Sequence, residues 1–222
     1  MNRSHPANAL QIFTIPARVV GQPPDPDGHA EWLVRGLTKN KVLNTPGYPQ
    51  SVPKHPGDVT SYIVKSMPTL GEGVFATRDI SRDGMIFAER PLVVIPMALV
   101  ATPKSMLAPG NESRLADHTK AVMLEQERQL EVALGRMDAG SRSKFMALPN
   151  CHPGDGHGTL NGIARTNGYG IHNLTDGDIQ PANGNPFYYS AVCDIGSKIT
   201  HRFRIFFIWS FFATGERLFF NS

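Results

Sequence analysis

The chain has 222 residues, 41% of them hydrophobic, which is enough to build the core of one ordinary domain with an appended segment. A net charge of +3, with 18% charged residues and no long lysine or arginine run, argues against direct nucleic-acid binding. The first residues lack the apolar core of a signal peptide, and the apolar run 205–212 is far shorter than the ~20 residues that span a bilayer. We therefore expect a cytoplasmic or nuclear protein that makes no membrane contact.

Residues 1–57 are interpreted as a proline-rich, mostly irregular leader. Half of the chain's 18 prolines fall in about the first 60 residues. Proline fixes φ and has no amide donor, so such a stretch disfavours helices and central strands. Two short elements are expected within it, at 11–20 and 29–37. The rest of the chain, 58–222, is the expected domain.

The next stretch predicts several short strands. Residues 58–66 and 92–100 are strand candidates, and Val74–Thr77 and Met85–Glu89 are expected to form a hairpin through the turn at Asp83-Gly84. Just before this hairpin, glycines 71 and 73 flank Glu72. The backbone there can bend sharply, and another group can approach it without meeting a Cβ atom.

Residues 111–149 predict a pair of helices inserted between two sets of strands. The first helix begins at Asn111 and is amphipathic, with apolar residues at helical spacing: Leu115, Val122, Met123, Leu130, Leu134 and Met137. It is expected to end at Gly140, and Ser141 is expected to cap a shorter helix that Pro149 stops. Strands are predicted again at 166–174 and 187–195. The elements together indicate an α+β fold, rich in short strands and hairpins, with a helical insert.

The cysteines and histidines predict no metal site. Cys151, His152, His157 and His172 match no ligand spacing for zinc. The only other cysteine is Cys193, and two cysteines without a Cys-x-x-Cys motif fit reduced intracellular thiols better than a disulfide framework.

Two blocks of sequence resemble one known family. The first is Gly71-Glu-Gly-Val-Phe-Ala-Thr-Arg-Asp-Ile80, followed by Gly84-Met-Ile and by Glu89-Arg-Pro-Leu92. The second is Phe145-Met-Ala-Leu-Pro-Asn-Cys-His-Pro153 with Gly162-Ile-Ala-Arg-Thr-Asn-Gly-Tyr-Gly-Ile171. Their order and content resemble the opening and middle of fungal SET-domain proteins, over roughly 64–199. Members of this family are protein-lysine methyltransferases that use S-adenosylmethionine.

The resemblance implies a SET-like fold and a cofactor site. In the family, the backbone corresponding to Gly71-Glu72-Gly73 lies along S-adenosylmethionine, and Asn167 stands where a cofactor-binding asparagine is expected. Where the family has Ser-Arg-Ile-Asn-His-Ser-Cys, this chain reads Ser197-Lys-Ile-Thr-His-Arg-Phe203, so His201 is the remaining candidate there.

The end of the chain, 200–222, diverges from the family. If the Asn-His-Ser-Cys segment is deleted instead, Gly215–Ser222 corresponds to the family's Gly-Glu-Glu-Leu segment, with Ser222 in place of the catalytic tyrosine. Either alignment leaves the SET-like fold incomplete at the C-terminus, and the catalytic residues are unknown. The aromatic crowding of 203–222 also fits translation of an unspliced intron or a shifted reading frame.

The sequence supports three functional hypotheses. The leading one is a SET-domain protein of lysine-methyltransferase descent, with impaired or absent activity, whose partner is a lysine-bearing protein such as a histone. The second is a non-catalytic protein-interaction module of SET descent that uses the helical insert and the leader. The third is an active enzyme whose pocket has been rebuilt around Tyr169, Tyr188 or Tyr189.

Overall fold

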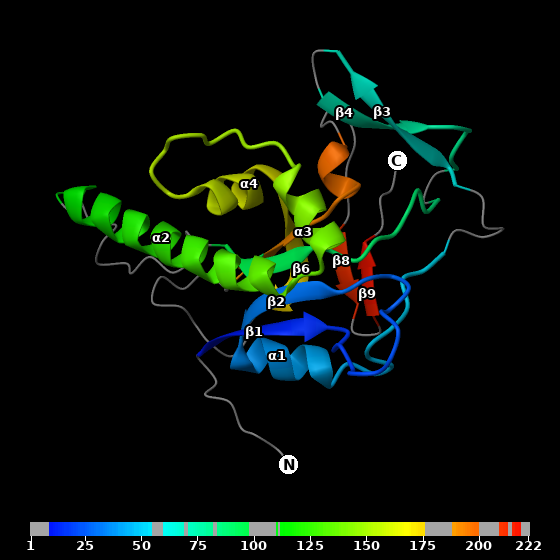
Figure 1. Cartoon of the computed structure of the whole chain (residues 1–222), viewed down its shortest axis with the longest axis horizontal. Helices are drawn as coiled ribbons and strands as arrows, with labels where there is room; N and C mark the ends of the chain where they lie inside the picture. Colours follow the sequence, from blue (N-terminus) through cyan, green and yellow to red (C-terminus); the bar gives the residue numbers. More distant parts are fainter. Residues whose placement is uncertain are drawn as a thin grey trace.

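The computed structural model describes residues 9–54, 60–68, 71–81, 84–97, 110, 112–175, 188–199, 209–212 and 215–218. These residues form an α+β fold with one seven-stranded mixed sheet and one two-stranded sheet (Figure 1). The helical content lies mostly between the two halves of the strand content, as the sequence indicates. None of the described helices is both long enough and apolar enough to cross a membrane.

The elements follow one another in an irregular alternation. In chain order they are β1 (Leu10–Ile15), β2 (Ala30–Arg35), α1 (Gly36–Leu43), β3 (Tyr62–Met67), β4 (Gly71–Ala76), β5 (Val93–Pro96), α2 (Glu112–Arg136), α3 (Ala139–Met146), α4 (Thr159–Asn167), β6 (Gly168–Thr175), β7 (Tyr188–Val192), the 3-10 helix η4 (Gly196–Lys198), β8 (Trp209–Phe212) and β9 (Gly215–Leu218).

The large sheet has the strand order β1-β2-β5-β7-β6-β8-β9. Neighbours are antiparallel except for β2 with β5 and β6 with β8, which are parallel. Strands β8 and β9 from the divergent end therefore extend this sheet beyond β6. A parallel pair needs a long crossover connection, and the chain between β2 and β5 includes α1 and the small sheet.

Strand β2 is buried on both faces of the sheet. Trp32 and Val34 point into a core that also holds Val42 of α1, whereas Leu33 points to the opposite face, against α2 and α3. This alternation is the period-2 pattern of a strand, and all three β2 residues are at most 1% exposed. Figure 1 shows the same arrangement, with α1 on one side of β1 and β2 and α2 on the other.

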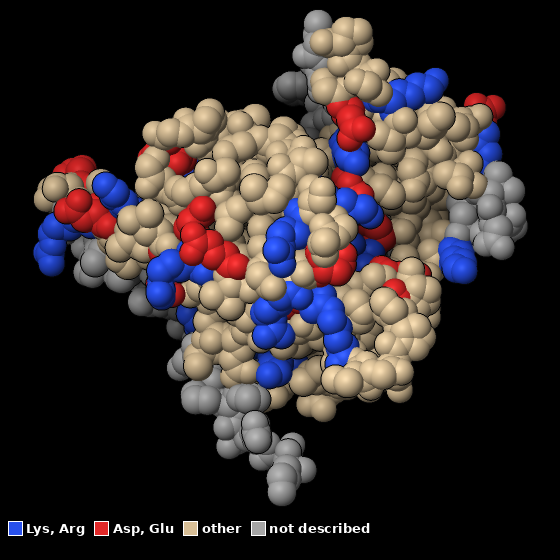
Figure 2. All heavy atoms as spheres, viewed as in Figure 1, with Lys and Arg blue, Asp and Glu red and all other residues tan. Residues whose placement is uncertain are grey.

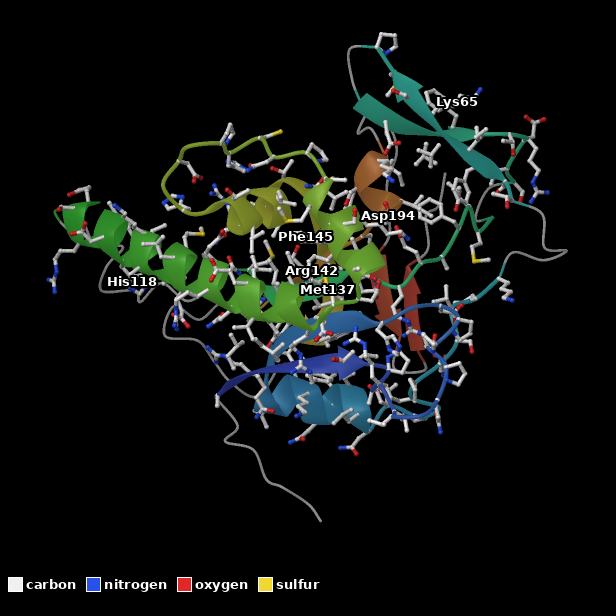
Figure 3. The ribbon with its side chains drawn as sticks, in the orientation of Figure 1. Lys65, His118, Met137, Arg142, Phe145 and Asp194 are labelled. Carbon is white, nitrogen blue, oxygen red and sulfur yellow. The ribbon has the colours of Figure 1, made fainter. Side chains whose placement is uncertain are left out.

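Helices α2, α3 and α4 form the second layer. Leu130 and Leu134 of α2, Phe145 of α3 and Ile163 of α4 are buried together against Val93 of the sheet. Figure 3 shows Phe145 and Met137 in this region. Arg142 closes the end of α2, because its guanidinium donates to the carbonyl oxygens of residues 134, 135 and 137.

The interpretation of residues 1–57 as a leader outside the domain needs correction. Within this range, β1 and β2 are two strands of the large sheet, and Trp32 is among the largest fully buried side chains. The described part of this range therefore includes two strands of the large sheet. The prolines cluster in the connections around these strands, which is where proline is tolerated.

The predicted hairpin between Val74–Thr77 and Met85–Glu89 is wrong. Strand β4 pairs instead with β3, in a register that places Ile63 opposite Phe75, and the described part of 84–92 contains no strand. The strand candidates at 58–66 and 92–100 correspond to β3 and β5. The small β3–β4 sheet lies apart from the large one in Figure 1.

The helix ends also differ from the prediction. Helix α2 ends at Arg136, before Gly140. The cap of α3 is Asp138, whose carboxylate accepts from the backbone N–H of Ser141 at 2.8 Å, so Ser141 lies inside the helix rather than at its cap. Helix α4 has no predicted counterpart.

Candidate functional site

The glycines that flank Glu72 lie at the start of β4. Gly71 has a φ of +77°, in the left-handed region that favours glycine. Among the described residues, apart from Gly71 itself and its chain neighbours, no atom lies within 4 Å of the point where its Cβ would stand. A Cβ on Gly73 would instead lie 2.6 Å from the methyl carbon of Met67. The backbone is therefore open at Gly71, and the space beside Gly73 is filled by a side chain.

The carboxylate of Glu72 joins β4 to η4. Its Oε2 lies 3.3 Å from Nζ of Lys198, and the same Nζ lies 2.7 Å from Oδ1 of Asp194. Partial burial works to lower the pKa of Lys198, but the two carboxylates outweigh it and raise that pKa. Lys198 is therefore held as a cation between two acidic groups.

Asn167 ends α4 and faces inward. Its side-chain amide donates to the carbonyl oxygens of Pro149 and Ile163 at 2.8 and 2.7 Å. Its own backbone carbonyl oxygen accepts from the hydroxyl of Ser197 in η4 at 3.4 Å. The N-terminus of the same helix is held by Glu127 of α2, which accepts from the N–H groups of residues 160 and 161. Asn167 is thus positioned by contacts at both ends of its helix.

Glu89 holds η4 from the other side. Its carboxylate accepts from the backbone N–H groups of Ile195 and Gly196 at 3.0 and 2.5 Å. Burial raises the pKa of Glu89 to about 7, although the hydrogen bonds from these N–H groups favour the charged form. Asp194, beside η4 in Figure 3, adds to the increase through its charge. In the sequence, Glu89 lies within a matched block, but nothing there assigned it a role.

We call the group formed by Glu72, Glu89, Asn167, Tyr169, Asp194 and η4 the η4 junction. Tyr169 belongs to it because its hydroxyl donates to the carbonyl oxygen of Gly196 at 2.7 Å, and burial raises the pKa of this phenol. Burial works to raise the pKa of Asp194, but hydrogen bonds from Lys198 and Lys144 lower it overall. The junction therefore brings together groups from β4, α4 and β6.

Of the five residues expected at the cofactor site, two contact the same 3-10 helix, Glu72 and Asn167. Gly71, Glu72 and Gly73 lie on β4, and Asn167 reaches the same 3-10 helix from α4. His201 lies outside the described residues. Of the candidate tyrosines, Tyr169 belongs to the junction. Tyr189 is fully buried and accepts from the backbone N–H of Arg35, and the side chain of Tyr188 is outside the described part.

The side chain of Asn167 does not fit the role of a hydrogen-bond donor to S-adenosylmethionine. Both N–H groups of the Asn167 amide already bind backbone carbonyls, so this side chain has no donor left for a ligand. Two cavities among the described residues, of about 1610 and 260 Å³, are lined neither by β4 nor by Asn167. Chemically, the junction is a set of buried and half-buried hydrogen bonds and ion pairs. It contains one carboxyl group, Glu89, with a pKa of about 7.

The smaller cavity lies beside Glu89. It is also lined by Arg90, Lys144 and Asp194, so charged groups of both signs surround it. Within the described ranges, no three histidine, cysteine or acidic side chains are close enough to hold a metal ion. Cys151 is exposed and Cys193 is buried, and neither is in a disulfide.

No protein-family model, curated protein or solved structure matches this chain.

Proposed function

We propose that this chain is a SET-domain protein of lysine-methyltransferase descent, located in the cytoplasm or nucleus, whose own activity is impaired or absent. The observation that carries the proposal is the meeting of β4 and α4 at η4. Glu72 and Asn167 are far apart in the sequence, yet each contacts a residue of η4: Glu72 pairs with Lys198, and the backbone carbonyl of Asn167 accepts from Ser197. A cofactor clamp assembled from several motifs would need this convergence, and the SET resemblance assigns both residues to that clamp.

The chemistry of lysine methylation explains why we expect the activity to be impaired. Methyl transfer from a sulfonium donor needs the amine, methyl group and sulfur aligned with water excluded. The attacking amine must be neutral, although a solvated lysine has a pKa of about 10.4, so an apolar channel is needed. At the η4 junction, the amide of Asn167 faces the protein interior, and Glu72 is a half-exposed carboxylate paired with Lys198. These features favour a structural role over catalysis.

A non-catalytic interaction module is the alternative. One observation favours it: the larger cavity is formed by the β1–β2 connection together with the ends of α2 and α3. These are the proline-rich segment and the helical insert, the two parts that such a module would use. Under this alternative the η4 junction only stabilises the fold, and binding takes place elsewhere.

The test is transfer of tritium from labelled S-adenosylmethionine by the full chain to histones and to a mixture of other lysine-rich proteins. We expect no incorporation above that of heat-denatured chain, with an active lysine methyltransferase as the positive control. Incorporation above this background would overturn the proposal of impaired activity.

A rebuilt active site would give a distinct result in the same assay. If incorporation is found, Tyr169→Phe, Tyr188→Phe and Tyr189→Phe are compared one at a time. Loss of turnover in one variant, with folding retained, would identify a replacement for the missing catalytic tyrosine. Tyr169 is the first to test because its hydroxyl lies at the η4 junction.

A further inference from the structure

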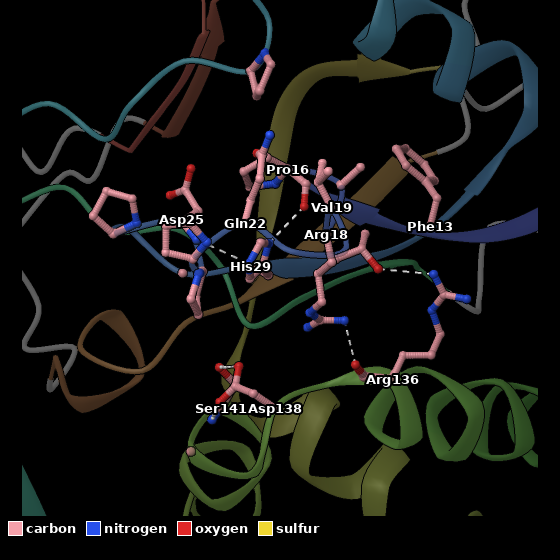
Figure 4. Close-up of a pocket in the computed structure, with 18 of the residues that line it drawn as sticks. Phe13, Pro16, Arg18, Val19, Gln22, Asp25, His29, Arg136, Asp138 and Ser141 are labelled. Carbon is pink, nitrogen blue, oxygen red and sulfur yellow. Dashed lines mark hydrogen bonds between the residues drawn. The ribbon is translucent and has the colours of Figure 1, made fainter.

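The larger cavity is a cleft between the β1–β2 connection and the helical layer. Its volume is about 1610 Å³, and its walls include Arg18 from the connection, Arg136 at the end of α2, and Asp138 and Ser141 of the α3 start. Figure 4 shows Arg18 reaching toward the backbone of Arg136, with Asp25 and His29 farther along the connection. None of the described lining residues belongs to the η4 junction, so a ligand site in this cleft would not depend on methyltransferase descent.

A buried carboxylate organises two arginines at one end of this cleft. Glu31 of β2 is fully buried, and its two oxygens lie 3.1 Å from Nη1 of Arg18 and 2.9 Å from Nε of Arg136. The hydroxyl of Thr14 also contacts both oxygens of Glu31 at 3.0 Å. Two guanidinium groups thus share one carboxylate, which leaves one positive charge in excess at this place.

Part of each guanidinium is available to a ligand. The side chains of Arg18 and Arg136 are 37% and 43% exposed. Arg18 uses Nη1 for Glu31 and for the carbonyl of Arg136, and Arg136 uses Nε and Nη2 for Glu31 and Thr14. Within the described part of the chain, Nη2 of Arg18 and Nη1 of Arg136 have no hydrogen-bond partner. These N–H groups are held in position by a buried anion, which reduces the entropy lost when they bind.

The acidic residues of the cleft are already engaged. Both carboxylate oxygens of Asp138 accept from Ser141, at the N-terminus of α3. Oδ1 of Asp25 accepts from the N–H of Asp27 and lies 3.6 Å from Nη2 of Arg90. Among the described residues of the cleft, each acidic side chain therefore already has a hydrogen-bond or ion-pair partner. The arginine pair, by contrast, has one positive charge in excess of its shared carboxylate. Figure 2 shows lysine and arginine atoms gathered near the middle of this face, over β1 and β2.

Another part of the wall is apolar. It is formed by prolines from two segments: Pro16, Pro23, Pro24, Pro26 and Pro49. His29 fixes this wall, because its Nε2 accepts from the N–H of Asp25 and its Nδ1–H donates to the carbonyl of Pro16 at 2.8 Å. Lys39 lies 5.2 Å from the ring centre of Phe13, so a further cation faces the cleft beside an apolar surface.

We propose that this cleft binds a peptide segment of a partner protein that carries an aspartate or glutamate. The carboxylate would accept from the free N–H groups of Arg18 and Arg136, and the neighbouring residues would pack on the proline wall. The cleft is larger than the roughly 300–1,000 Å³ of sites for small molecules, which favours a chain segment over a free metabolite. A basic segment such as a histone tail would meet charge of its own sign at the arginine pair.

The experiment selects peptides from a displayed random library on the immobilised full chain. We expect the bound pool to be enriched in aspartate and glutamate. The most enriched peptide is then synthesised with a fluorescent label and titrated against the wild type and the variants Arg18→Gln and Arg128→Gln. Arg128 is a matched control, because it is an exposed arginine on α2 paired with one carboxylate, outside the cleft.

Arg18→Gln should weaken binding by on the order of tenfold, and Arg128→Gln should leave it within about twofold. A library without acidic enrichment, or equal affinities for the two variants, would overturn the proposal. If a phosphoserine in place of the acidic residue is needed for binding, the ligand is a phosphate and the carboxylate assignment is wrong. If Arg18→Gln does not fold, Arg18→Lys and Lys39→Gln are measured instead, and an unchanged affinity in both would overturn the proposal.

Discussion

Nζ of Lys198 lies 3.3 Å from Oε2 of Glu72, and this contact joins η4 to the glycine-flanked strand β4. The side chain of Glu72 is 55% exposed, whereas that of Asp194, on the other side of Lys198, is 17% exposed and lies closer. Exposed ion pairs contribute about 0–1 kcal/mol, and pairs screened less by water contribute more.

A double-mutant cycle should therefore give a smaller coupling for Glu72 with Lys198 than for Asp194 with Lys198. The variants are Glu72→Gln, Asp194→Asn and Lys198→Met, and the quantity measured is the free energy of unfolding in urea. We expect the Glu72 coupling to stay below about 1 kcal/mol and to fall further in high salt. A larger coupling for Glu72 than for Asp194 would contradict the arrangement of the η4 junction.

The side-chain amide of Asn167 should contribute to the free energy of unfolding. In Asn167→Ala, the carbonyl oxygens of Pro149 and Ile163 lose their buried donor, which should lower the free energy of unfolding by about 1–3 kcal/mol. The control is Asn40→Ala, at an exposed position of α1, where alanine favours the helix and the effect should be near zero or stabilising. Similar stabilities for the two variants would show that the Asn167 amide is not held as described.

Glu89 should make stability depend on pH. Its pKa is raised from 4.5 to about 7 by folding, so the folded chain binds a proton more tightly than the unfolded chain. The stability from this group is fully present below about pH 4.5 and is lost as the pH rises through about 7. Glu89→Gln cannot titrate, so the difference in unfolding free energy between wild type and variant should change between these limits.

Urea unfolding at about pH 5 and about pH 8 measures this difference. Relative to Glu89→Gln, the wild type should be less stable at the higher pH by on the order of 1–3 kcal/mol. Asp194 works in the opposite direction, because its pKa is lowered; it is present in both proteins, so the part of its effect that does not depend on Glu89 cancels in the difference. A difference that does not change with pH would mean that Glu89 stays ionised throughout.

Replacing Trp32 should show that the proline-rich segment belongs to the fold. It is 1% exposed in the core between the sheet and α1, so Trp32→Ala should cost about 3–5 kcal/mol of unfolding free energy. Val20→Ala is the control in the same segment, since Val20 is fully exposed, and its effect should stay within about 0.5 kcal/mol. Equal stabilities would restore the interpretation of residues 1–57 as a leader outside the domain.

The helical insert was predictable from the sequence because its pattern is long. Apolar residues such as Leu130 and Leu134 repeat at helical spacing over several turns, and both are buried in α2. Helix α4 was missed because it is short and carries Gly162 and two asparagines, which disfavour a helix interior, and its N-terminus is held by Glu127 from another helix. Contacts of this kind are tertiary and leave no local signal.

Strand pairing was harder to predict than strand position. Strands β3, β5, β6 and β7 were anticipated, but the partner of β4 was not, because a short apolar run pairs equally well with a strand on either side. The burial of β2 was overlooked for a different reason. The prolines on both sides dominated the composition, although Trp32-Leu-Val34 is a short apolar run typical of a buried strand.

Only those residues of the candidate site to which the family resemblance assigns a role were predictable from the sequence. It pointed to Gly71, Glu72, Gly73 and Asn167, and of these Glu72 and Asn167 contact η4. It did not point to Glu89, whose role depends on backbone N–H groups of η4. The cleft with Arg18 and Arg136 was also out of reach, since these arginines lie more than a hundred residues apart and share a single buried carboxylate.

The most direct test of the central claim is a calorimetric titration of the full chain with S-adenosylmethionine. Because both N–H groups of the Asn167 amide are already bound, and neither of the two cavities described above is lined by β4 or by Asn167, we expect no saturable heat at millimolar cofactor. Saturable binding that is lost when Gly71 is changed to valine, with folding retained, would contradict the proposed loss of function. It would show that a working cofactor site is present beside β4.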